Sequence, residues 1–186
     1  MAFNIGEEIV SAYLHYVKGC EFIQQNVYTR DVQGEIDVVG IHLQQRAIYI
    51  CEVAVHLTAG LQYVKAAQPD NVGKIITKFS KDIEYANKYF PDYEKHFMFW
   101  SPIVKTAGER AKYSQMRDVD QIAAHIQATY GTAIEWIINE RFADCLAEMR
   151  LVASRQTQDL KSPVMRFMQL EEYLRRHMAR SPRRTQ

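Results

Sequence analysis

The spacing of apolar residues predicts a helix close to the beginning of the chain. Between residues 4 and 18 the apolar positions recur every three or four residues, as on the buried face of an amphipathic helix. They are Ile5, Ile9, Ala12, Tyr13, Tyr16 and Val17. Asn4 precedes this run as a residue of the N-cap type, and Gly19 follows it as a common helix stop. We therefore expect the first helix over residues 4–18.

The segment after this helix has the pattern of strands. Three runs rich in β-branched and aromatic residues cover 20–28, 35–42 and 47–56, separated by a turn at 31–34 and a polar link at 44–46. Short connections of this kind join neighbouring antiparallel strands. The sequence thus predicts a meander of three strands.

The rest of the chain alternates between helical and strand-like segments. Helical spacing returns over 70–90, where Pro91 ends the helix. Beyond it we expect a strand at 96–104, a helix at about 119–130, a strand at 132–138, and helices at 139–156 and 163–179. A meander followed by helix-linked strands predicts an α/β fold, with a central mixed sheet flanked by helices on both faces.

The length of 186 residues suits one domain with an extension. We expect a core domain over 1–138, a helical extension over 139–180 packed on the core or on a partner, and a flexible basic tail at 181–186. The end of the chain is rich in arginine, at Arg175, Arg176, Arg180, Arg183 and Arg184. Phosphate contact, an anionic partner surface and a solvated tail are the open interpretations of this group.

Composition narrows the class of protein. Apolar residues make up 47% and charged residues 24% of the chain, the balance of an ordinary globular protein. Neither a leader-like start nor an apolar run of about 18 residues is present, so we expect a cytoplasmic protein without a membrane partner. The cysteines, Cys20, Cys51 and Cys145, are odd in number and lack CxxC spacing, which favours buried thiols over disulfides or a zinc cluster.

Acidic residues interrupt two of the expected strands. Because side chains alternate along a strand, Glu35 and Asp37 share one face, and Glu52, Ala54 and His56 share one face of the next strand. Neighbouring strands would then present carboxylates side by side, as strand-end acids in solvent or as a site for a cation.

A buried, unpaired carboxylate costs several kcal/mol, which a divalent metal would offset. Oxygen ligands favour Mg²⁺ or Mn²⁺ over Zn²⁺. The chemistry expected of such a site is phosphodiester hydrolysis.

Three sequence features together resemble a known nuclease family. Gly6-Glu7-Glu8 in the first helix, GEID at 34–37 and EVA at 52–54 resemble the PD-(D/E)xK, or restriction-endonuclease-like, superfamily, especially its Holliday-junction-resolvase-like members. The resemblance covers roughly residues 5–90. It implies an αβββαβ core, a Mg²⁺ or Mn²⁺ cofactor and DNA as the partner. Asp37 and Glu52 would resemble the metal-binding acids, and Glu7 or Glu8 the acid on the first helix.

The chain departs from the family pattern at Ala54, where the family has its catalytic lysine. Lys74 is the replacement we expect, because in some members this lysine has moved to the following helix. His56 is a second candidate, for metal binding or proton transfer, and Gln62 is a third. The resemblance implies a metal-dependent DNA endonuclease in repair, recombination or defence. The alternative is a degenerate nuclease fold that binds nucleic acid or a protein without cutting.

Overall fold

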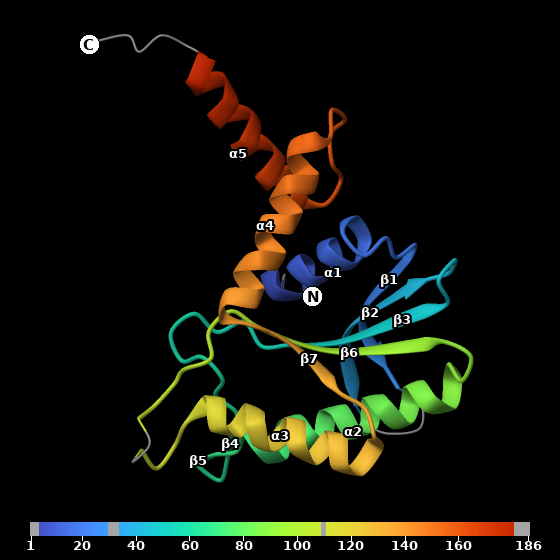
Figure 1. Ribbon diagram of the computed structural model, residues 1–186, viewed down its shortest axis with the longest axis vertical. Coiled ribbons are helices and arrows are strands. Elements are labelled where there is room, and N and C mark those ends of the chain that lie inside the picture. Colours follow the sequence, from blue (N-terminus) through green and yellow to red (C-terminus); the bar gives the residue numbers. More distant parts are fainter. Residues whose placement is uncertain (1–3, 30–33, 109–110, 181–186) are drawn as a thin grey trace.

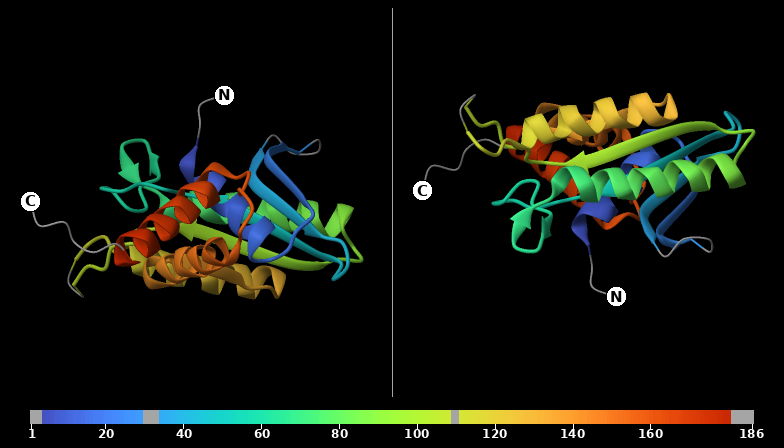
Figure 2. Two further views of the ribbon diagram at one scale, coloured as in Figure 1. Left: turned by 90° about the horizontal axis from the view of Figure 1, so that it is seen from above. Right: turned by 90° about the horizontal axis from the view of Figure 1, so that it is seen from below.

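The fold is built on a five-stranded mixed sheet with the strand order β1-β2-β3-β6-β7. The computed structural model describes residues 4–29, 34–108 and 111–180. Helices cover both faces of the sheet (Figures 1 and 2). The protein therefore has the three-layer α/β arrangement expected from the sequence.

The first half of the sheet is an antiparallel meander. After helix α1 (Ile5–Tyr16), strands β1 (Phe22–Tyr28), β2 (Glu35–His42) and β3 (Ala47–Val53) pair in chain order. The N-cap is as expected, because the backbone N–H of Gly6 donates to the side-chain oxygen of Asn4 over 3.0 Å.

The connection after β3 contains a small hairpin and a long helix. Strands β4 (Val64–Lys65) and β5 (Gln68–Pro69) pair only with each other. Helix α2 (Asn71–Tyr89) follows and returns the chain along one face of the sheet. This crossover lets the next strand run parallel to β3.

The second half of the sheet is parallel. Strand β6 (Glu94–Ser101) pairs with β3, and strand β7 (Ile134–Ile138) pairs with β6, with helix α3 (Gln115–Tyr130) between them in the chain. β3 and most of β6 are buried, as strands covered on both faces should be.

Each face of the sheet has its own apolar core. One core contains buried side chains of α1 together with the last two helices, α4 (Asn139–Arg155) and α5 (Pro163–Arg180). The other contains buried side chains of α2 and α3. In Figure 1, α1 and α4 accordingly lie above the sheet and α2 and α3 below it.

The last helix packs on the molecule only in its first half. Its buried residues are Val164, Met165, Met168 and Gln169, and its far end runs away from the sheet (Figure 1). Several large apolar side chains on this helix are exposed, at Phe167, Leu170, Tyr173, Leu174 and Met178. No helix in the described part of the chain has the length and apolar character needed to cross a membrane.

The structure differs from the predicted elements mainly at strand ends. The strand expected over 47–56 ends at Val53, and the strand expected over 96–104 covers Glu94–Ser101, since Pro102 lacks an N–H group for the ladder. The β4–β5 hairpin was not predicted. Most of the turn at 31–34 and the basic tail at 181–186 lie outside the described residues.

Candidate active site

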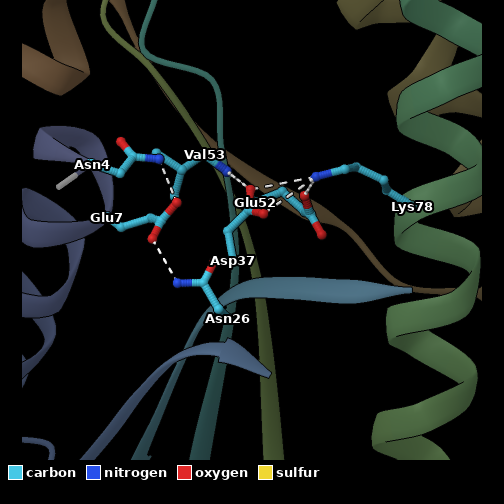
Figure 3. Close-up of polar contacts among 7 residues, drawn as sticks. All are labelled: Asn4, Glu7, Asn26, Asp37, Glu52, Val53 and Lys78. Carbon is cyan, nitrogen blue, oxygen red and sulfur yellow. Dashed lines mark hydrogen bonds and ion pairs between the residues drawn. The ribbon is translucent and has the colours of Figure 1, made fainter. Parts of the chain in front are cut away.

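Asp37 and Glu52 come together where β2 and β3 separate. The ladder between these strands runs from His42↔Ala47 to Val38↔Cys51, so Asp37 and Glu52 occupy the next position along it. At this point the Asp37 side chain, and not a carbonyl group of β2, accepts the backbone N–H of Val53. The distance from that nitrogen to Oδ2 of Asp37 is 2.7 Å (Figure 3). Strand alternation thus places the two acids side by side, as expected from the sequence.

A lysine on α2 contacts both acids. The Nζ atom of Lys78 donates to Oε2 of Glu52 and lies 3.4 Å from Oδ2 and 3.5 Å from Oδ1 of Asp37. Figure 3 shows the ammonium group reaching from the helix across to the strands. The side chain of Glu52 is 1% exposed and that of Lys78 is 25% exposed. The cation therefore lies between a buried carboxylate and solvent.

Asp82 is a further acid at this site, one helical turn beyond Lys78. It is only 3% exposed. Its Oδ2 atom and Oε1 of Glu52 are buried without a hydrogen-bond partner within the described residues. The two carboxyl groups are hydrogen-bond neighbours, and such a bond needs a proton on one of them, because an ionised carboxylate only accepts. The site therefore holds more acid than Lys78 neutralises.

The electrostatics of this cluster follow from its burial. Burial raises the pKa of Glu52 well above its ordinary value, and the charges of Asp37 and Asp82 add to this effect. Burial also raises the pKa of Asp82, to about 7, although the hydrogen bond with Glu52 and the charge of Lys78 oppose the shift. Burial disfavours the charged form of Lys78, but Glu52 and Asp37 outweigh it and raise the lysine pKa. Lys78 is thus an ammonium ion among acids that gain from added positive charge.

Glu7 lies on the other side of the two strands, on α1. The residue before it, Gly6, allows a close approach, because a Cβ atom there would come within 2.6 Å of Val55 and 2.8 Å of Val53. Burial raises the pKa of Glu7, the Asn26 and Asn4 hydrogen bonds lower it, and the charge of Asp37 raises it. Of the two acids proposed for this helix, Glu7 is therefore the one that faces the cluster.

The contacts of Glu7 also explain an unusual backbone conformation in β1. Asn26 donates from Nδ2 to Oε2 of Glu7 over 3.1 Å, and Asn4 donates to the other oxygen (Figure 3). Asn26 has φ of +53°, a left-handed conformation in the middle of a strand. The register of β1 and β2 pairs Gln25 with Val38 and Val27 with Ile36, and so skips Asn26 and Asp37 between them. Glu8 points elsewhere and accepts a hydrogen bond from Gln25.

The lysine that contacts the two acids is Lys78, whereas the expected Lys74 lines the pocket beside them. Lys74 is exposed, and no side-chain hydrogen bond or ion pair of Lys74 is found among the described residues. One turn of helix separates the two positions. Which turn faces the strand ends depends on how α2 packs, and the sequence alone does not determine this.

The other expected positions lie away from the carboxylates. β3 ends at Val53, so its alternation does not extend to His56, which is exposed in the following loop. Gln62 is exposed and lines a separate pocket. Ala54 is buried in the core that also contains the buried side chains of α2 and α3.

A pocket of about 250 Å³ opens beside the cluster. Its lining combines both signs of charge, with Lys74, Lys78 and Lys81 facing Asp37 and Asp82. Lysines at these spacings lie along one side of α2. The pocket offers ammonium groups to an anion directly beside the acids.

A magnesium ion fits the chemistry of this donor set. No group of three or more His, Cys, Asp or Glu side chains among the described residues is arranged to hold a metal ion. Magnesium, however, is commonly held by one or two carboxylates together with water and substrate phosphate. The unpartnered Oε1 of Glu52 leaves such an acceptor at the site. Asp37 and Glu52 are the residues that would hold the ion.

Sequence reasoning missed Lys78, Asp82 and Asn26. A signal for Asp82 is present, because it interrupts the apolar stripe of α2 formed by Ile75, Phe79, Ile83 and Ala86. The conformation of Asn26 has no comparable signal.

Comparison of the chain with protein-family models, with curated proteins and with solved structures found no match.

Proposed function

We propose that this chain is a metal-dependent DNA endonuclease of the PD-(D/E)xK type, acting in the cytoplasm in repair, recombination or defence. The observation that carries this proposal is the contact of Lys78 with both Asp37 and Glu52. In this resemblance, Ala54 stands at the position where the family has its catalytic lysine. Lys78 supplies an ammonium group at the same pair of acids from the neighbouring helix, within the αβββαβ order that the family implies.

Each residue has a task that follows from its position. Asp37 and Glu52 would hold the metal, which would activate water and neutralise charge on the phosphate. Lys78 orients the attacking water and stabilises negative charge that develops at the scissile phosphate. Glu7 adds negative charge behind Asp37 and is kept in place by Asn26.

The pocket beside the acids suits a nucleic-acid backbone. Lys74 and Lys81 flank Lys78 on its lining and can contact phosphates next to the one that is cut. Such contacts fix the position of the strand and carry no base information. We accordingly propose DNA as the substrate without a sequence preference from this surface.

A cleavage assay tests the proposal. Purified protein is incubated with linear, single-stranded and branched DNA in Mg²⁺ or Mn²⁺, and the parent is compared with Asp37→Asn, Glu52→Gln and Lys78→Ala. We expect each variant to lower the cleavage rate by at least about 100-fold, because each removes a metal ligand or the charge-stabilising cation. Circular dichroism confirms that each variant is folded.

Two matched controls make the assay specific. Asp92→Asn removes an exposed acid and Lys161→Ala an exposed lysine, both outside the site; cleavage should stay within about twofold of the parent. A folded Asp37→Asn variant that cuts at the parental rate would exclude the proposed site. Cleavage that persists in excess chelator would exclude the metal.

A second candidate is a protein of the same fold that binds nucleic acid or a protein partner without cutting it. The observation in its favour is that Lys78 already neutralises part of the charge of Asp37 and Glu52 without a metal. The exposed apolar side chains of α5 offer this candidate a surface for a protein partner or a second copy. It predicts DNA or partner binding that survives Asp37→Asn, with no cleavage under any metal condition.

A further inference from the structure

Asp82 has no task in the proposed reaction and is costly where it lies. It is 3% exposed, and its Oδ2 atom has no hydrogen-bond partner within the described residues. Unpartnered buried carboxyls are rare, because their loss of hydration is not compensated. Its neighbour Glu52 is itself an acid, so the partner that would neutralise Asp82 is a cation.

The cation with the larger electrostatic effect on Asp82 is Lys78, ahead of Lys81. The two residues are four positions apart on α2, the spacing at which side chains on one helix face meet. Both line the same pocket. Lys78 retains 25% exposure, so its ammonium can turn toward Asp82 by side-chain rotation, without movement of the helix.

A metal would compete with Lys78 for its present partners. The ammonium occupies Oε2 of Glu52 and lies against both oxygens of Asp37. These carboxylates are the groups that would hold the ion. Two cations on the same oxygens repel each other, so binding of one favours departure of the other.

We propose that Lys78 is an exchangeable internal cation: it occupies Asp37 and Glu52 in the metal-free protein, and a divalent ion displaces it to Asp82. Asp82 is then a positioning residue that holds the lysine beside the bound ion. This inference rests on the proposed function, since it assigns the ion to Asp37 and Glu52. It accounts for both the unpartnered carboxyl of Asp82 and the present contacts of Lys78 by one exchange among four side chains.

The test is a double-mutant cycle on metal affinity. Binding of Mn²⁺ to the full chain without DNA is measured by titration calorimetry for the parent, Lys78→Met, Asp82→Asn and the double variant. Methionine keeps the length of the lysine without its charge, and asparagine keeps the shape of the aspartate. The readout is a dissociation constant, so it does not depend on cleavage.

The exchange predicts opposite effects for the two single variants. Lys78→Met should bind Mn²⁺ about tenfold more tightly, because the competing cation is gone, and Asp82→Asn should bind it about tenfold more weakly, because the displaced lysine loses its partner. In the Lys78→Met background, Asp82→Asn should change affinity by less than about threefold. Equal weakening by Asp82→Asn in both backgrounds would make Asp82 a metal ligand and overturn the proposal. So would the absence of any effect of Asp82→Asn.

A second measurement serves if a variant does not fold. A crystal structure of the parent with Mn²⁺ should place Nζ of Lys78 at Asp82 and away from Glu52; a lysine still on Glu52 overturns the exchange. Failure of the proposed function has a different signature. If neither the parent nor Lys78→Met binds Mn²⁺, or if Asp37→Asn leaves binding unchanged, the metal site itself is wrong.

Discussion

The Nζ atom of Lys78 donates to Oε2 of Glu52 although the two residues lie 26 positions apart, on α2 and β3. Glu52 lies in the middle of the sheet with its side chain 1% exposed, whereas the lysine side chain remains 25% exposed. The pair therefore links the buried interior of the sheet to the pocket beside α2. Its properties govern both the stability of the fold and the chemistry that the site can support.

Removing the ammonium should destabilise the fold. Lys78→Met leaves Glu52 buried without its cation, and the loss of one partner of a buried ion pair costs on the order of 3 kcal/mol. We expect a loss of this size in the free energy of unfolding, measured by urea titration at pH 8. Lys74→Met, one turn away and exposed, should change stability by less than about 0.5 kcal/mol.

Asp82 should make stability depend on pH. The folded protein raises the pKa of this carboxyl from its ordinary 3.8 to about 7, mainly by burial. Between these values the folded state holds the proton and the unfolded state has released it. The contribution of Asp82 to stability is therefore fully present below about pH 4 and is lost as pH rises toward 7, at up to about 1.4 kcal/mol per pH unit.

Asp82→Asn tests this dependence. The variant should be more stable than the parent at pH 8 and should flatten the slope of unfolding free energy between pH 5 and 7. Asp120→Asn, an exposed acid on α3, is the control and should leave the slope unchanged. A parental slope in Asp82→Asn would show that Asp82 is ionised in the folded protein.

The conformation of Asn26 should matter for stability as well as for its side chain. A residue with a Cβ atom pays about 1–2 kcal/mol in the left-handed region, less for asparagine and nothing for glycine. Asn26→Ala loses both the tolerated conformation and the donor to Glu7, so it should destabilise by about 2 kcal/mol. Asn26→Gly loses only the donor and should cost less. Thermal unfolding of the two variants checks the order; equal losses would mean that the left-handed conformation contributes nothing.

The sequence predicted the pairing of Asp37 with Glu52, which depends on the alternation of side chains along a strand. Asp37 and Glu52 are neighbours because side chains alternate and a short connection joins their strands, and both facts are local. The same logic was extended too far at His56, because β3 ends at Val53 and His56 lies in the loop that follows.

The missing parts depend on tertiary packing or on rare conformations. Lys78 is chosen over Lys74 by the rotation of α2 against the sheet, which no local pattern specifies. The β4–β5 hairpin turns through Ala66 and Ala67, both with positive φ, where Gly or Asn would have signalled the turn. Asp82 was the detectable omission, because an acid on the apolar stripe of a helix requires an explanation.

The lysines of α2 should also determine how DNA binding responds to salt. Lys74 and Lys81 line the pocket beside the acids, and each phosphate contact contributes about −0.9 to the slope of log affinity against log salt concentration. In Ca²⁺, which permits binding without rapid cleavage if the site behaves as proposed, Lys74→Ala and Lys81→Ala should each reduce the slope by about one. The loss should be similar for all DNA sequences, because phosphate contacts carry no base information.

Lys161→Ala, distant in the chain and exposed, is the control for charge alone, and fluorescence anisotropy between 50 and 200 mM salt gives the slopes. Unchanged slopes in both pocket variants would remove this face of α2 from the DNA path and leave the arginine-rich end of the chain as the surface to test.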